Sequence, residues 1–388
     1  MTNNPLTTSD PQPTMPFTPQ DAHWMSLALR LAEQGLYSTS PNPRVGCVIV
    51  KNEVQIGSGW HQRAGEPHAE VYALREAGAA AENATAYVTL EPCSHTGRTP
   101  PCADALIAAG VARVVIAMQD PNPLVSGKGI AKLRAAGIVV ESGLMEASAQ
   151  ALNRGFVSRM TQGVPWVRSK IGMSLDGRTA LANGVSQWIT SPEARLDVQH
   201  WRARSCAVLT GINTILADDA QLNVRSIETS RQPLRVVLDS QLRIPLTAKL
   251  LQSQGVLIYT TRNDINKIIA LKKRGAVVCV LSGTQIDLKV MLRDLAQRGC
   301  NEVLVEAGSI LNGALLKAGC VDELIVYLAP QLLGEAARGM AQLGELTRLD
   351  QRIQLYWQEV RQVGRDLRIT ARVVRHAEES TDEQVPTT

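Results

Sequence analysis

The stretch PHAEVYALREAG, residues 67–78, places a histidine and a glutamate in an otherwise apolar, alanine-rich pattern. His68 and Glu70 stand two positions apart, directly after a proline, and neither side chain suits a buried helix face. A second stretch, EPCSHTGRTPPC at residues 91–102, follows the strand-like run TAYVTLE and carries Cys93 and Cys102 at either end of a loop. Gly97 and the prolines allow this loop to fold back, so both thiols can reach one point.

One imidazole and two thiolates are natural ligands for Zn²⁺. Three protein ligands leave the fourth tetrahedral position to water, which is the arrangement of a catalytic zinc site. The metal lowers the pKa of that water to about 7, and Glu70 can take its proton and return it to a leaving nitrogen. Two alternatives stay open: His68 and Glu70 as surface residues beside ordinary buried thiols, or a structural zinc with His95 as fourth ligand.

The order histidine-x-glutamate, proline-cysteine and second cysteine is typical of zinc deaminases. The chain resembles the cytidine-deaminase superfamily, and more closely the bacterial bifunctional deaminase-reductases of riboflavin biosynthesis. The residues that carry this resemblance are SPNPRVGCVIV (40–50), GWHQRAGEPHAE (59–70) and VTLEPCSHTGRTPPC (88–102). Eight residues separate the two cysteines, where the wider superfamily has two; this departure agrees with the riboflavin branch. The resemblance extends from about residue 20 to 375.

The resemblance implies a role for each polar residue of this half. The metal ligands would be His68, Cys93 and Cys102, holding one Zn²⁺ per chain, and Glu70 would be the catalytic proton shuttle. Further contacts to the substrate would come from Asn42, His61, His95 and Arg98. An amide held between two prolines suits a pyrimidine edge, and an arginine suits a phosphate. Without the resemblance, Asn42 reads as a turn residue and His61 as a polar group at a strand end.

The second half contains a strand, a small-residue turn and a helix in NEVLVEAGSILNGALLKAG, residues 301–319. The free amides at such a helix N-terminus can bind phosphate. A dinucleotide fingerprint with three spaced glycines is absent from the sequence, and ordinary packing is the more common reason for this turn. On its own, this pattern does not predict a nucleotide-binding site.

This half resembles the reductase domain of the same bifunctional family, whose fold is similar to dihydrofolate reductase. The resemblance implies hydride transfer from NADPH to the ribosyl carbonyl carbon, which opens the ribose to a ribityl chain. It implies cofactor contacts from Gly172, Trp188, Thr214, Asp218, Ser240, Gly308, Ser309, Ile310, Leu311, Asn312, Gly313 and Ala314. It implies substrate contacts from Ser186, Arg202, Leu222, Arg225 and Glu306. Two further candidates for residues near the chemistry, Lys170 and Asp176, come from the sequence pattern and not from the resemblance. Packing or turn roles are the alternatives for both.

Strands alternate with helices in both halves, which predicts α/β layers. We expect a cytidine-deaminase-like three-layer α/β/α domain over residues 18–164 and a dihydrofolate-reductase-like α/β domain over 165–375. Polar tails at 1–17 and 376–388 are expected to be disordered.

Composition limits the possible partners. The chain has 388 residues, a net charge of +4 and 4% aromatic residues, which argues against a nucleic-acid partner. Runs of 18 apolar residues and an export signal are both missing from the sequence, so we expect a cytoplasmic enzyme with reduced thiols and no membrane partner. The expected partner is a small phosphorylated pyrimidine, and the family resemblance favours a homo-oligomer.

Two other functions stay open at this stage. The first is a nucleic-acid base deaminase with an RNA-binding second half, which weak charge and few aromatic residues disfavour. The second is a zinc-stabilised scaffold that senses a nucleotide. Chelation separates the scaffold from the enzyme, because the scaffold would unfold, whereas the enzyme would lose only its release of ammonia.

Overall fold

The computed structural model describes residues 17–94, 101–123 and 125–374. Both expected tails lie largely outside these residues, and so do His95 and Arg98. Contacts divide the chain into two compact units: residues up to Gly35 with Arg44–Asn153, and Leu36–Pro43 with residues from Arg154 onward. The functional boundary at residue 164 stays a prediction, since the helix that precedes it groups with the second unit.

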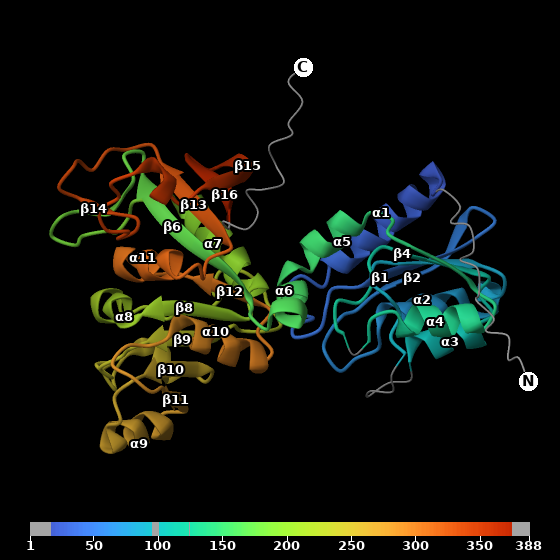
Figure 1. Ribbon diagram of the computed structural model, residues 1–388, viewed down its shortest axis with the longest axis horizontal. Coiled ribbons are helices and arrows are strands. Elements are labelled where there is room, and N and C mark those ends of the chain that lie inside the picture. The colour runs from blue at the N-terminus through green and yellow to red at the C-terminus, as the bar shows by residue number, and fades with distance from the viewer. Residues whose placement is uncertain (1–16, 95–100, 124, 375–388) are drawn as a thin grey trace, which may run out of the picture. The chain divides into compact units, whose positions relative to one another are not determined.

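The first unit is built on a sheet that, within the described residues, has five strands in the order β2-β1-β3-β4-β5. The first three run antiparallel and the last three parallel. The strands are β1 (Gly46–Lys51), β2 (Val54–Trp60), β3 (Thr85–Val88), β4 (Arg113–Ile116) and β5 (Val139–Ser142). The helices are α1 (Pro19–Glu33), α2 (Ala69–Ala77), η1 (Gly78–Ala81), α3 (Cys102–Ala108), α4 (Lys128–Ala135) and α5 (Glu146–Leu152). Helices α1 and α5 cover one face, and α2, α3 and α4 cover the other (Figure 1).

Glycines in β2 fix how closely α2 approaches the sheet. A Cβ at Gly59 would lie 2.5 Å from the carbonyl oxygen of Ala69, and one at Gly57 would lie 2.2 Å from that of Ala73. Any side chain at either position would therefore push the helix away. This close approach places the start of α2 against β2, and His68 is the N-cap residue of α2.

The second unit is built on a sheet that, among the described residues, has nine strands in the order β11-β10-β9-β8-β12-β6-β13-β16-β15. Strands β11 to β13 are parallel, and β16 and β15 extend the sheet antiparallel. Their bounds are β6 (Trp166–Ser174), β8 (Ala207–Gly211), β9 (Leu234–Leu238), β10 (Val256–Thr260), β11 (Ala276–Val280), β12 (Glu302–Val305), β13 (Glu323–Ala329), β15 (Leu355–Val363) and β16 (Asp366–Val373). Of the last two strands, β15 forms the edge of the sheet and β16 lies next to it on the inside.

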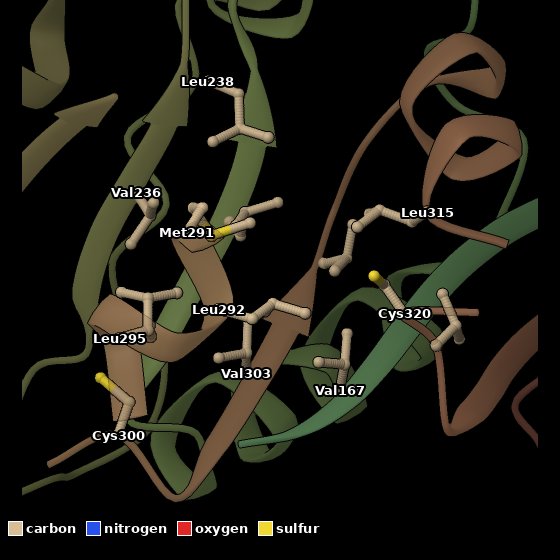
Figure 2. Close-up of a cluster of buried hydrophobic side chains, with 14 of the residues drawn as sticks. Val167, Val236, Leu238, Met291, Leu292, Leu295, Cys300, Val303, Leu315 and Cys320 are labelled. Carbon is tan, nitrogen blue, oxygen red and sulfur yellow. The ribbon is translucent and has the colours of Figure 1, made fainter. Parts of the chain in front are cut away.

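Helix α6 (Arg154–Gln162) precedes the first strand of this unit, and the other helices lie between later strands. These are α7 (Pro192–Arg204), α8 (Ile212–Asp218), α9 (Ile265–Lys273), α10 (Leu288–Gln297) and α11 (Ser309–Lys317), with short turns η2 (Lys249–Gln252) and η3 (Leu349–Gln351). A small ribbon pairs β7 (Arg178–Ala180) with β14 (Arg338–Gly339). Alternation along the strands sends neighbouring side chains to opposite faces. On one face, Met291, Leu292 and Leu295 of α10 pack against Val236 and Val303 (Figure 2).

Candidate active sites

His68, Cys93 and Cys102 converge in the first unit. The Nδ1 atom of His68 lies 3.2 Å from Sγ of Cys102 and 3.6 Å from Sγ of Cys93. The three potential ligand atoms all lie within 4.8 Å of one another. A tetrahedral zinc with N and S ligands at ordinary bond lengths places its ligand atoms about 3.6 Å apart. The geometry and the chemistry of these donors therefore fit zinc.

Local structure explains why these three residues meet. His68 caps α2, Cys102 is the first residue of α3, and Cys93 follows the end of β3. The backbone N–H of Cys102 donates to Sγ of Cys93 over 3.3 Å. Hydrogen bonds from Cys102 and from His68 lower the pKa of Cys93 to about 4. Cys93 is thus prepared as a thiolate, the form that binds metal.

Glu70 lies beside this cluster on the first turn of α2, with 3% of its surface exposed. Burial raises the pKa of Glu70 to about 6, although the nearby His68 opposes this shift. Its Oε2 is buried without a hydrogen-bond partner among the described residues. An unpaired carboxylate oxygen in a dry site is costly unless a ligand satisfies it. Glu70 is therefore positioned to hold and release a proton.

Glu91, which precedes Pro92 and Cys93, was missed from the sequence. Its buried carboxylate accepts hydrogen bonds from the backbone N–H groups at the start of α4, those of Gly127, Gly129 and Ile130, at 2.9, 2.9 and 3.2 Å. It also accepts one from Asp120 at 3.1 Å. Glu91 therefore ties the cysteine segment to α4. The signal that could have revealed it is a charged residue at the end of an apolar strand, which needs a partner when buried.

The other residues expected at the deaminase site have different placements. His61 is 2% exposed and its ring meets that of His68 edge to face, with 5.3 Å between the ring centroids. Its Nδ1 lies 3.1 Å from the carbonyl oxygen of Pro67. Asn42 lies in the segment Leu36–Pro43 that groups with the second unit. His95 and Arg98 lie outside the described residues. Substrate binding by these four residues stays a prediction.

In the second unit the expected cofactor contacts gather at the carboxyl ends of the parallel strands. Gly172 lies on β6, Ser240 follows β9, and Thr214 and Asp218 lie on α8, which follows β8. Residues 308–314, which cover the turn after β12 and most of α11, complete the row. This edge is where open α/β sheets bind ligands.

The start of α11 has room for a phosphate. No side chain caps Gly308, its N-cap residue, and a Cβ added there would meet nothing within 4 Å. The N–H groups of the first turn of a helix are free to bind an anion unless a side chain occupies them. The side chain of Asn312 is held in place by β6, since the Oγ of Ser169 donates to its Oδ1 over 3.0 Å. These residues fit the pyrophosphate of a dinucleotide.

Arg202 and Glu306 form a bidentate pair, with Nε to Oε1 at 2.5 Å and Nη2 to Oε2 at 2.9 Å. The third guanidinium nitrogen donates to the carbonyl oxygen of Asn223 over 2.9 Å. Burial raises the pKa of Glu306, but Arg202 outweighs it and the net pKa is lowered. All three nitrogens of the Arg202 guanidinium are therefore hydrogen-bonded within the protein. In this arrangement Arg202 orients the Glu306 carboxylate more directly than it could bind a phosphate.

Lys170 lies close to this pair. Burial lowers its pKa, which Glu306 partly opposes. Its Nζ would lie 3.8 Å from a Cβ at Gly172, so the amine is adjacent to an expected cofactor contact. Asp176 is placed differently: its carboxylate accepts from the N–H of Leu333 and of Gly334, at 3.1 and 2.8 Å. Those bonds give Asp176 a turn-holding role.

The remaining expected contacts differ in exposure. Trp188 is 64% exposed, with the guanidinium of Arg195 4.4 Å from its ring centroid, and Ser186 in the same loop is half-buried. Leu222 is 2% exposed within the core, so a substrate could meet only its backbone. Arg225 is exposed and donates to Oδ1 of Asn223 over 3.3 Å. Each of these contacts stays a prediction.

Comparisons with known proteins agree with this geometry. Residues 18–118 match the cytidine and deoxycytidylate deaminase zinc-binding region, and residues 165–369 match the RibD C-terminal domain. The riboflavin biosynthesis protein RibD of Escherichia coli (strain K12) is 51% identical over 360 residues, which cover 90% of this chain and 98% of that protein. The chain belongs to the RibD family. It is a zinc deaminase and an NADPH-dependent reductase of riboflavin biosynthesis, as expected from the sequence.

Solved structures of RibD proteins confirm the fold class. RibD of Acinetobacter baumannii, form 1, is 49% identical with a TM-score of 0.87, over 92% of this chain and 99% of that one. A deaminase-reductase from Thermotoga maritima is 31% identical with a TM-score of 0.82 over the same shares. Within the described ranges, no helix is both long enough and apolar enough to cross a membrane.

Proposed function

We propose that the first unit deaminates 2,5-diamino-6-(5-phosphoribosylamino)pyrimidin-4(3H)-one and that the second reduces the ribosyl group of the product to ribityl with NADPH. The Thermotoga maritima relative is a diaminohydroxyphosphoribosylaminopyrimidine deaminase and 5-amino-6-(5-phosphoribosylamino)uracil reductase. The observation that carries the proposal is the convergence of His68, Cys93 and Cys102 beside the buried Glu70. A scaffold would need no dry, unpaired carboxylate beside its metal ligands.

In deamination, His68, Cys93 and Cys102 would hold the metal and Glu70 would move the proton. When bound, zinc supplies Lewis-acid chemistry that makes water nucleophilic at neutral pH. Glu70 takes a proton from the attacking water on its free Oε2 and delivers it to the leaving nitrogen. His61 packs against the imidazole of His68 and fixes its orientation. Ammonia leaves and the ring carbon gains the oxygen of water.

In reduction, the strand edge would place the nicotinamide near Gly172 and the pyrophosphate on α11. The ribosyl carbonyl carbon accepts a hydride from NADPH, and its oxygen needs a proton. Among the described cations, Lys170 lies nearest to Gly172. Its lowered pKa makes the protonated side chain, the ammonium, a stronger proton donor. Glu306, fixed by Arg202, would accept hydrogen bonds from sugar hydroxyls.

One assay tests both reactions. The purified chain is given the diaminopyrimidinone phosphate with NADPH, and ammonia release and NADPH oxidation are followed together. We expect ammonia release first, and NADPH oxidation only after it. Chelation should stop the first signal with this substrate, while NADPH oxidation on the pre-deaminated substrate persists. NADPH oxidation without deamination would contradict the proposed order of steps.

Two further expectations are part of the proposal: a cytoplasmic location and a homo-oligomeric state. The cysteines are free thiols, as they would be in a reducing compartment. Sedimentation of the purified chain tests the second expectation, and a purely monomeric species would contradict it.

A further inference from the structure

Arg195, near the start of α7, contacts the loop that carries Trp188 at two points. Its guanidinium carbon lies 4.4 Å from the centroid of the Trp188 ring. Its Nη1 donates to the carbonyl oxygen of Thr190 over 2.6 Å. One side chain therefore holds both the indole and the loop backbone two positions later.

This loop crosses the strand edge where the cofactor is expected. At one end, Nε2 of Gln187 donates over 3.2 Å to Oδ1 of Asp218, an expected cofactor contact at the end of α8. At the other end, a Cβ at Gly172 on β6 would lie 3.1 Å from Cγ2 of Thr190, so Thr190 packs against a second expected contact. Helix α8 follows β8, and β12 lies between β8 and β6. Residues 187–190 therefore span the carboxyl ends of β8, β12 and β6.

The backbone of the loop is fixed, but the Trp188 ring has free space around it. The carbonyl oxygen of the buried Ile189 accepts from Nε2 of Gln331 over 3.2 Å. Trp188 itself is 64% exposed, and a cavity of about 540 Å³ is lined by Trp188, Arg195 and the turn between β15 and β16. An exposed side chain with open space beside it can adopt several rotamers. A contact that restrains the ring reduces the entropy lost when a ligand binds to it.

The charge of Arg195 acts on the indole ring and not on a carboxylate. Among the described residues, the arginines of α7 that form ion pairs are Arg202 and Arg204. Elsewhere in the part of the chain that the structure describes, cations lie 5.5–5.9 Å from ring centroids, near the limit of about 6 Å for this attraction. At 4.4 Å, the contact between Arg195 and Trp188 is well inside that limit.

We propose that Arg195 is a positioning residue for the reduction, because it holds the indole of Trp188 in the orientation that contacts NADPH. This inference rests on the proposed cofactor contacts at Gly172, Trp188 and Asp218. The guanidinium lies over one face of the indole, and the exposure of the ring leaves the other face open to the cofactor. Without the guanidinium, the ring can turn toward the cavity, and the carbonyl oxygen of Thr190 loses its donor.

The test separates the charge of Arg195 from its size, in the full chain with the pre-deaminated substrate. Arg195→Met keeps a long side chain without the charge, and Arg195→Lys keeps the charge. We expect Arg195→Met to raise the KM for NADPH, and its Kd by calorimetry, about 3- to 30-fold, with kcat changed less than about twofold. Arg195→Lys should recover most of this loss. Arg365→Met removes an exposed arginine that lines the same cavity, and it is the matched control with an unchanged KM.

A double-mutant cycle distinguishes positioning of the ring from support of the helix. In a Trp188→Leu background, Arg195→Met should raise the KM no further, because the ring that it holds is gone. An equal effect in both backgrounds, or an unchanged KM in Arg195→Met alone, would overturn the inference. An unchanged KM in Trp188→Leu would remove Trp188 from the cofactor site and the inference with it.

A different result would overturn the proposed function itself. If the unaltered chain did not oxidise NADPH with the pre-deaminated substrate, the proposed reduction would be wrong, whatever the role of Arg195. Thermal melting verifies that each variant folds, and Arg195→Gln replaces Arg195→Met if the methionine variant does not.

Discussion

Replacing Glu91 by glutamine should release the cysteine segment from α4. The carboxylate accepts hydrogen bonds from four backbone N–H groups, and Glu91 is only 3% exposed. Glutamine has the same shape but keeps one acceptor oxygen, so its amide would face two of those donors. Hydrogen bonds to charged groups contribute about 1.5–3 kcal/mol each, which gives a loss of roughly 3–6 kcal/mol for the two. A loss of this size is a large fraction of a typical domain stability of about 5–15 kcal/mol.

The packing around Glu91 leaves a glutamine side chain little room to move away from these N–H donors. A Cβ at Gly129 would lie 2.0 Å from the carbonyl oxygen of Pro92 and 3.2 Å from Oε1 of Glu91. Helix α4 and the cysteine segment are therefore in direct backbone contact. If the contact loosens, Cys93 shifts relative to the other two ligands. We expect zinc affinity to fall about 10- to 100-fold, as happens when the supports of metal ligands are removed.

The assay follows each activity as urea rises. In Glu91→Gln, deaminase activity should be lost at a lower urea concentration than in the unaltered chain, while the reductase midpoint stays unchanged. Zinc content after dialysis against a weak chelator gives a second reading. Glu82→Gln is the matched control, since Glu82 is exposed and lies shortly before β3, the strand that Glu91 follows. A deaminase midpoint equal to that of this control would refute the argument that Glu91 holds the segment.

Glu70→Gln should abolish deamination yet keep zinc and reductase activity, and deamination at an unchanged rate would exclude Glu70 as the proton shuttle. Arg202→Ala should raise the KM of the reduction step and destabilise the second unit by about 3–5 kcal/mol, because it leaves Glu306 buried without its partner; an unchanged KM and melting temperature would contradict this. Burial raises the pKa of Asp21, but hydrogen bonds from Arg113 and others outweigh it and lower the pKa. The stabilising contribution of Asp21 is therefore present above its unfolded pKa of about 3.9 and is lost as pH falls below that value. The gap in thermal midpoint between the unaltered chain and Asp21→Asn should narrow below about pH 4, and a constant gap would show that the ion pair does not contribute.

The sequence predicted the deaminase chemistry because that chemistry depends on residue types with few alternative uses. A histidine, two cysteines and a glutamate at this spacing favour zinc, and the structure brings the three ligands together. The start of α1 depends on local residues in a similar way: Thr18 and Asp21 form a capping box within one turn, and Pro19 lies at the first helical position. Both signals are local or chemically specific.

Other features depend on contacts between distant residues. The family resemblance implies Arg202 as a substrate contact, which stays a prediction, but it gave no sign that the guanidinium pairs with Glu306, which lies on a different strand-helix connection. Asp176 was a candidate near the chemistry, and the structure shows it holding a turn near residue 333. The sequence did not show which groups pair with Glu91, because its partners at Gly127 and Gly129 are far along the chain.

The sequence by itself determined the kind of metal site, the alternation of strands and helices, and the helix starts, because each follows from residue chemistry or from spacing within a few positions. The tertiary structure alone decided which charged groups pair with each other, how closely α2 approaches β2, and which side chains line the strand edge from β6 to β9. These depend on strand order, and strand order brings together residues that no local pattern relates.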